Sequence, residues 1–175
     1  MVRSCLFEKS NSVCLFLLVI LAACNSNTNQ SSEVDVKSLI HDYSTDQISA
    51  TSASVDTSQL VVEKDNKEVN YDLPDDEFYV SIAPFINETH PCTFHSLTGC
   101  QGELVNTPFE VYIENANGNV LIDESIESFD NGFIDLWLPR DQEFKVIITL
   151  DDKQVESTIS TFEDDPTCIT TMQLI

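Results

Sequence analysis

The chain has 175 residues, of which 8 are Lys or Arg and 30 are Asp or Glu, so its formal net charge is −22 at pH 7. A surface of that sign repels phosphate groups and attracts cations, which excludes nucleic acid as a partner and favours metal ions or basic proteins. The acidity is equally consistent with a role in solubility alone.

The first 23 residues have the features of a secretory signal peptide. Arg3 and Lys9 precede an apolar run over residues 13–23, and a basic stretch before a short apolar run is typical of exported proteins. The run is about half of the roughly 20 residues that a membrane-spanning helix needs, so a permanent span is the weaker interpretation. We therefore predict that residues 1–23 are a signal peptide of the lipoprotein type.

The end of this segment predicts where the mature chain begins. Leu21, Ala22, Ala23 and Cys24 resemble the lipobox of bacterial lipoproteins, in which the Cys is diacylated and becomes the first mature residue. We predict lipidation of Cys24, and two or three acyl chains hold a protein to a membrane because each buried methylene contributes about 0.8 kcal/mol. Cleavage near Ala23 that releases a soluble protein stays open. Either way, the predicted location is the bacterial cell envelope, in the periplasm or at the outer cell surface.

Removal of this segment changes the charge and the cysteine count. Two basic residues and one acidic residue leave with it, so 6 basic residues face 29 acidic ones and the formal charge becomes −23. Cys5 and Cys14 also leave, and Cys24 is used for lipidation, so three of the six Cys remain as thiols. An odd number cannot all pair within one chain, so an oxidising compartment predicts either a disulfide with one free thiol or a metal site.

The first part of the mature chain is predicted to be a tether and a small α/β region. Residues 24–32 form the tether, because the residues after Cys24 are all Asn, Ser, Thr and Gln. Within residues 33–74, apolar residues near helical spacing up to residue 54 predict one or two short helices. Residues 60–62 and 69–73 then alternate like the two strands of a hairpin.

From residue 75 the sequence predicts short β-strands. Seven apolar or alternating runs separated by turns favour an antiparallel β-sandwich over residues 75–175, which makes the fold class mainly β. Asn117 and Gly118 suit a two-residue hairpin turn, and Trp137 is interpreted as a core residue. The runs cover residues 78–85, 109–114, 120–123, 133–138, 143–150, 154–161 and 170–175.

One stretch, residues 89–104, departs from the strand pattern because it concentrates Cys, His and Gly. Its two thiols, Cys92 and Cys100, would lie about 26 Å apart in an extended strand at roughly 3.3 Å per residue. A disulfide needs Cα atoms within about 7 Å, so the chain must fold back if these thiols share a bond or an ion, and two glycines permit that turn. One helical turn would place Cys92 and His95 on the same side.

The third thiol, Cys168, lies far along the chain in a loop that leads into the last run, so only tertiary folding can bring it to the others. Cys, Met and His are donors that monovalent copper prefers, which makes these thiols and His95 candidate metal ligands. Met172 is more typical of a core residue than of a ligand. His90, which precedes a proline, is interpreted as a turn residue.

Several interpretations of these residues stay open from the sequence. A disulfide between Cys92 and Cys100 could simply close a loop in an interaction domain without metal. The same thiols suit a thiol-disulfide oxidoreductase, which would exchange electrons with a substrate disulfide. Three thiolates with one imidazole also form an allowed zinc set. For His95, capping of a backbone group is the alternative to metal ligation.

Three runs carry a resemblance to a known family: HPCTFHSLTGCQGEL at residues 90–104, GFIDLWLPR at 132–140 and TCITTMQL at 167–174. Together they resemble the CueP family of periplasmic copper-binding proteins over roughly residues 73–175. The resemblance implies a copper site at Cys92, Cys100 and Cys168, and a protein that serves copper tolerance and delivers copper to an exported cuproenzyme. It also implies thiol-dependent reduction of Cu(II) to Cu(I) and a homodimer formed through the N-terminal region. We therefore favour a copper-binding protein over an enzyme, with reduction as an associated activity.

Overall fold

The computed structural model describes residues 34–175, which form one compact unit. These residues contain one helix and eleven strands arranged in three sheets, so the fold is mainly β with antiparallel pairing, as the sequence predicted. The predicted signal peptide, the tether and Cys24 lie outside the described residues. Within 34–175, no helix has the length and apolar composition needed to cross a bilayer. The division between residues 33–74 and 75–175 stays a prediction.

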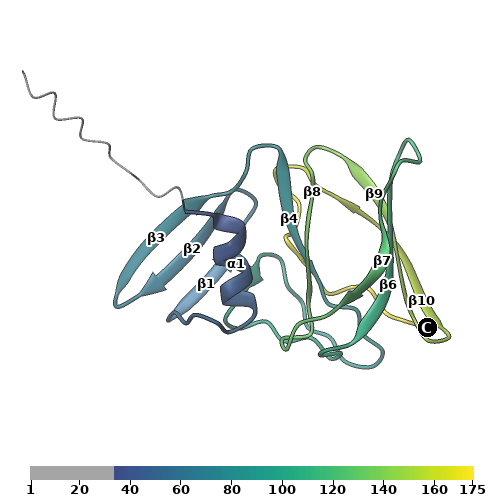
Figure 1. The fold of residues 1–175 in the computed structure, drawn as a ribbon, viewed down its shortest axis with the longest axis horizontal. Helices are drawn as coiled ribbons and strands as arrows, with labels where there is room; N and C mark the ends of the chain where they lie inside the picture. The colour runs from purple at the N-terminus through teal and green to yellow at the C-terminus, as the bar shows by residue number, and fades with distance from the viewer. Residues whose placement is uncertain (1–33) are drawn as a thin grey trace, which may run out of the picture. The chain divides into compact units, whose positions relative to one another are not determined.

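The N-terminal layer is a helix packed on a small sheet (Figure 1). Helix α1 (Val36–Ser44) begins at Asp35, whose side chain accepts hydrogen bonds from two backbone amides of the first turn. The sheet has the order β3-β2-β1-β5, with β1 Ser52–Val55, β2 Gln59–Lys64, β3 Lys67–Asp72 and β5 His95–Ser96. The predicted hairpin of β2 and β3 is present, and its turn is tight, with positive φ at both Asp65 and Asn66.

The region predicted to contain one or two short helices contains one, α1. Residues 52–55 are strand β1 and not part of a second helix, because Ala53 and Val55 alternate with serines and are fully buried on one face of the sheet. The helical turn that would place Cys92 and His95 on the same side does not form in the described chain, where His95 pairs with Val55 as part of β5. In both places pairing with a neighbouring strand determines the conformation.

The central sheet has the order β11-β4-β8, with β4 Glu77–Ile82, β8 Ile134–Pro139 and β11 Cys168–Ile169. The outer sheet has the order β10-β9-β6-β7, with β6 Pro108–Asn115, β7 Val120–Glu127, β9 Glu143–Leu150 and β10 Lys153–Ser160. All pairs of named strands are antiparallel except β11 with β4, which is parallel. The last strand, β11, lies earlier in the chain than the strand predicted at residues 170–175. Within that predicted run, Gln173 forms a single β-bridge with Phe85.

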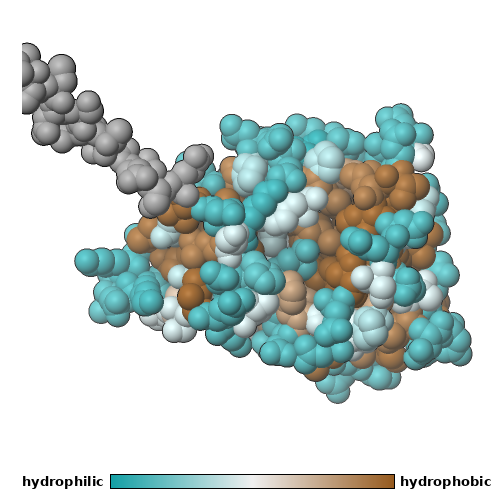
Figure 2. Space-filling model, viewed as in Figure 1, coloured by the Kyte–Doolittle hydropathy of each residue, from teal (hydrophilic) through white to brown (hydrophobic). Residues whose placement is uncertain are grey.

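The central sheet separates two apolar cores. Along β4, Phe78, Val80 and Ile82 face the outer sheet, whereas Tyr79 faces α1 and the first sheet. Trp137 is half-buried against the core between α1 and the first sheet, with the Lys37 ammonium 4.9 Å from its ring centroid. On the surface, hydrophilic residues cover the margins of the face in Figure 2, and apolar residues gather where β7 and β9 lie. The two cores hold β4, β8 and β11 in fixed positions, and the candidate site lies at one end of these strands.

Candidate metal site

Strand β11 brings the most distant thiol to the end of the central sheet. Cys168 pairs in register with Ser81 of β4, and its backbone amide donates a hydrogen bond of 3.1 Å to the carbonyl of Thr93. Its side chain packs with Ala83, Cys100 and Phe133 in a small buried cluster. A residue near the C-terminus is therefore held against the loop that carries the other two thiols.

A buried threonine fixes this junction. The Thr167 hydroxyl donates a 2.6 Å hydrogen bond to the carbonyl of Val55 in β1, and accepts one of 3.0 Å from the backbone amide of His95 in β5. Thr167 is fully buried, so both hydrogen bonds form away from water and are costly to lose. The imidazole of His95 and the thiol of Cys168 are thus positioned by one shared contact.

The loop between the first two thiols folds back after β5. Residues 97–99 form a turn, and the backbone amide of Cys100 donates a 3.0 Å hydrogen bond to the carbonyl of Ser96. Beyond the turn, the backbones of Gly102 and Gly132 approach so closely that a Cβ on either residue would lie within 2.7 Å of the other's carbonyl oxygen. The fold-back that the sequence required is therefore present, with glycines where the chains meet.

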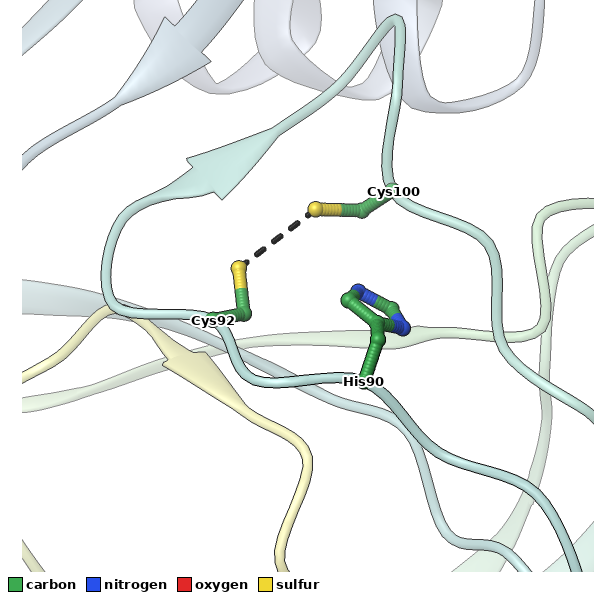
Figure 3. A group of neighbouring side chains, drawn as sticks. All are labelled: His90, Cys92 and Cys100. Atoms are coloured by element: carbon green, nitrogen blue, oxygen red, sulfur yellow. Dashed lines mark hydrogen bonds between the residues drawn. The ribbon is translucent and has the colours of Figure 1, made fainter.

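The three sulfur atoms converge in this cluster. Figure 3 shows Cys92 and Cys100 pointing toward one another, with 3.4 Å between their Sγ atoms, which is a contact and not the bond of about 2.0 Å found in a disulfide. The Cys92 thiol also donates to the carbonyl of Phe94 at 3.4 Å. Cys168 packs in the same cluster as both other Cys residues, and its Sγ lies within 4.8 Å of the Cys100 Sγ. All three are free thiols in the described structure.

The close approach of the three thiols and their burial give them different pKa values. The neighbouring Cys168 thiol, helped by the nearby imidazoles of His95 and His90, holds the pKa of the Cys100 thiol well below its usual value. The same contact, together with burial, raises the pKa of Cys168. Burial raises the pKa of Cys92. Cys100 is therefore the sulfur most readily present as a thiolate, which is the form that binds metal ions.

The imidazoles of His90 and His95 complete the cluster, and each has a buried nitrogen atom that makes no well-formed hydrogen bond. Among residues 34–175, neither ring nitrogen of His95 nor Nε2 of His90 has a hydrogen-bond partner in good geometry. His95 is fully buried and packs on Phe133, with ring centroids 4.4 Å apart. A buried polar atom without a partner destabilises a protein by about 1–3 kcal/mol. A bound metal ion would supply the missing partner, since neutral imidazole nitrogens are common metal ligands.

Two sets of three donors could each hold a metal ion. One consists of His90, Cys92 and Cys100, and the other of His95, Cys100 and Cys168; within each set the donor atoms lie within 4.8 Å of one another. Thiolate and imidazole are donors that suit monovalent copper and zinc. The residues present therefore fit a copper ion as cargo.

The candidate ligands from the sequence can now be placed. The cluster brings together all four residues that the sequence predicted as metal ligands, and their role as ligands stays a prediction: Cys92, His95, Cys100 and Cys168. Met172 is fully buried in the sandwich core, as expected of a lone Met. His90, interpreted as a turn residue, belongs to one of the two donor sets. Its position two residues before Cys92 was the available signal, because residues i and i+2 of an extended chain lie on the same side.

Comparison with known proteins identifies relatives of the whole folded part. A family model described as "Periplasmic copper-binding protein CueP" matches residues 35–173. The crystal structure of S.CueP is similar to this chain with a TM-score of 0.75 and 34% sequence identity, over 80% of this chain and 88% of that one. No curated protein matches.

Proposed function

The chain belongs to the CueP family of periplasmic copper-binding proteins, and from that premise we propose that it binds copper in the bacterial envelope through Cys92, Cys100 and Cys168, with His95 as a further donor. The observation that carries the proposal is the convergence of three free thiols, two of them buried, beside an imidazole whose nitrogens have no partner among residues 34–175. Soft sulfur donors favour Cu(I) over harder cations.

The role that follows is copper tolerance and delivery. A thiolate site releases Cu(I) by ligand exchange, so a partner with its own soft donors can take the ion without free copper being formed. The formal charge of −22 raises the local concentration of cations and of basic partner surfaces. We propose an exported cuproenzyme as the recipient.

Titration with Cu(I) against a competing chromogenic chelator tests the site. Replacing Cys100 or Cys168 with Ser should weaken Cu(I) binding by at least about 10–100-fold, the loss that removal of even an outer partner of a metal ligand causes. Met172→Leu is the matched control, because it removes a sulfur from the sandwich core and not from the site. Wild-type affinity in both Cys variants would disprove the site.

Reduction of Cu(II) is a second activity that the geometry favours, because the Sγ atoms of Cys92 and Cys100 lie 3.4 Å apart. Two thiols would give one electron each to two Cu(II) ions, forming one disulfide and two Cu(I) and releasing two protons. Thiol counting during Cu(II) addition should show the loss of two thiols for every two Cu(I) formed. Cu(I) formation without thiol loss would contradict this activity.

The same assays separate the alternatives. A thiol-disulfide oxidoreductase would reduce a substrate disulfide without copper. A zinc protein would retain Zn²⁺ in the presence of an equal amount of Cu(I), although thiolate sites usually bind copper more tightly.

Attachment and assembly complete the proposal. We propose that Cys24 is lipidated, which metabolic labelling with a fatty acid tests by comparing wild type with Cys24→Ser. We also propose a homodimer formed through the N-terminal region, which light scattering of the purified protein tests.

A further inference from the structure

The two donor sets share one sulfur and differ in depth. Cys100 belongs to both sets. In the first set His90 and Cys92 are half-buried, whereas all three members of the second set are buried. We define the first as the outer set and the second as the inner set. The shared ligand means that an ion can change sets while it stays bound to one sulfur.

The outer set is the one within reach of solvent. His90 lines a surface hollow together with Glu88, Gln101 and Glu103. On its other side, the His90 ring lies next to the pair of sulfurs (Figure 3). Carboxylates at the rim of a hollow favour the approach of a cation. His90 therefore stands between the acidic rim and the thiols.

The inner set is enclosed by the fold. His95 is held between Phe133 and Tyr79, with ring centroids at 4.4 and 6.2 Å. Cys168 is 2% exposed and is fixed by β11. The inner donors are therefore less accessible to a partner protein than His90 and Cys92 of the outer set.

We propose that Cu(I) binds first at the outer set, His90, Cys92 and Cys100, and then moves to the inner set, His95, Cys100 and Cys168, with Cys100 bound throughout. The step exchanges one imidazole and one thiolate for another of each, so the copper keeps its oxidation state. Cys168 gives up its proton as Cys92 takes one up, so the charge of the site does not change, and both thiols belong to the same packed cluster. Release follows the reverse path. This inference rests on the proposed copper function.

The rate of Cu(I) exchange with a chromogenic chelator, measured by stopped flow, tests the order of events. His90→Asn and Cys92→Ser should slow uptake and release by about tenfold, and should weaken equilibrium affinity less than the loss of an inner donor does. His95→Asn and Cys168→Ser should instead weaken affinity by about tenfold or more and speed release. His41→Asn is the control, since His41 lies on α1 and packs on Phe129.

X-ray absorption of the Cu(I)-loaded protein gives a second readout. We expect two sulfurs and one nitrogen around copper in wild type and in Cys92→Ser. Three sulfurs in wild type, or equal loss of affinity in Cys92→Ser and Cys168→Ser with unchanged rates, would overturn the two-set path but leave the copper site intact. Wild-type affinity in Cys100→Ser would overturn the copper site itself.

Discussion

The sandwich core and the candidate metal site lie next to each other on the same strands, but they bury different kinds of atom. Ile82, the last residue of β4, lies in the apolar core, and Ala83, the next residue, lies in the cysteine cluster. The core buries carbon, and its side chains need no polar partner. The site buries imidazole nitrogens that have none within the described chain. The sandwich core therefore stabilises the fold. The buried imidazoles of the site lower that stability but stay available to bind a metal ion.

Truncating the sandwich core should have the largest effect. Phe109 is fully buried between the sheets, so Phe109→Ala should lower the free energy of unfolding by about 3–5 kcal/mol. Urea denaturation measures the loss, and exposed Val120→Ala is the control, expected within about 0.5 kcal/mol. Cu(I) affinity of the folded protein should stay unchanged. A large affinity loss would mean that core and site are not separable.

The glycine contact beside the site should show the next largest effect. Gly132 has φ +77°, and an added Cβ would lie 2.7 Å from the Gly102 carbonyl oxygen, so Gly132→Ala should destabilise by about 1–3 kcal/mol. Gly118 has φ +78° but open space around it. Gly118→Ala should therefore lower the free energy of unfolding by only about 1 kcal/mol. Equal losses in the two variants would show that the close backbone approach contributes nothing.

Removing a buried imidazole should separate function from stability. His95→Leu should leave the free energy of unfolding unchanged or raise it by about 1 kcal/mol, because no well-formed hydrogen bond of the ring is lost. Cu(I) affinity should fall. Thr167→Val is the contrast, since it removes two buried hydrogen bonds and should destabilise by about 1–3 kcal/mol. Strong destabilisation by His95→Leu would contradict this view of the site.

The smallest effect concerns pH. Burial acts against the charge of Glu103, but hydrogen bonds from Asn87 and Ile86 outweigh it and lower the pKa to about 2. Because the pKa is lower in the folded state, the stabilisation is complete above about pH 4.5 and disappears as the pH falls through about 2. Wild type should therefore exceed Glu103→Gln in stability at pH 7, and the two should converge near pH 2. A constant difference would contradict the assignment.

Much of the fold could be predicted from local pattern. Alternation of apolar and polar residues located β6, β8, β9 and β10, because a strand with one buried face repeats every two residues. A nearly continuous apolar run located β4, which is buried on both faces. Strand β1 was missed, since four residues rich in Ser carry little signal. Strand β11 was misplaced because its pairing with β4 is parallel and non-local.

The donor atoms could be read from the amino-acid sequence, since residue type fixes whether sulfur or nitrogen is available to a metal. Which donors meet is a property of the folded chain. Cys168 reaches Cys100 through the pairing of β11 with β4, and His90 joins the cluster through the course of a loop. Both depend on contacts between residues distant along the chain, which no local pattern encodes.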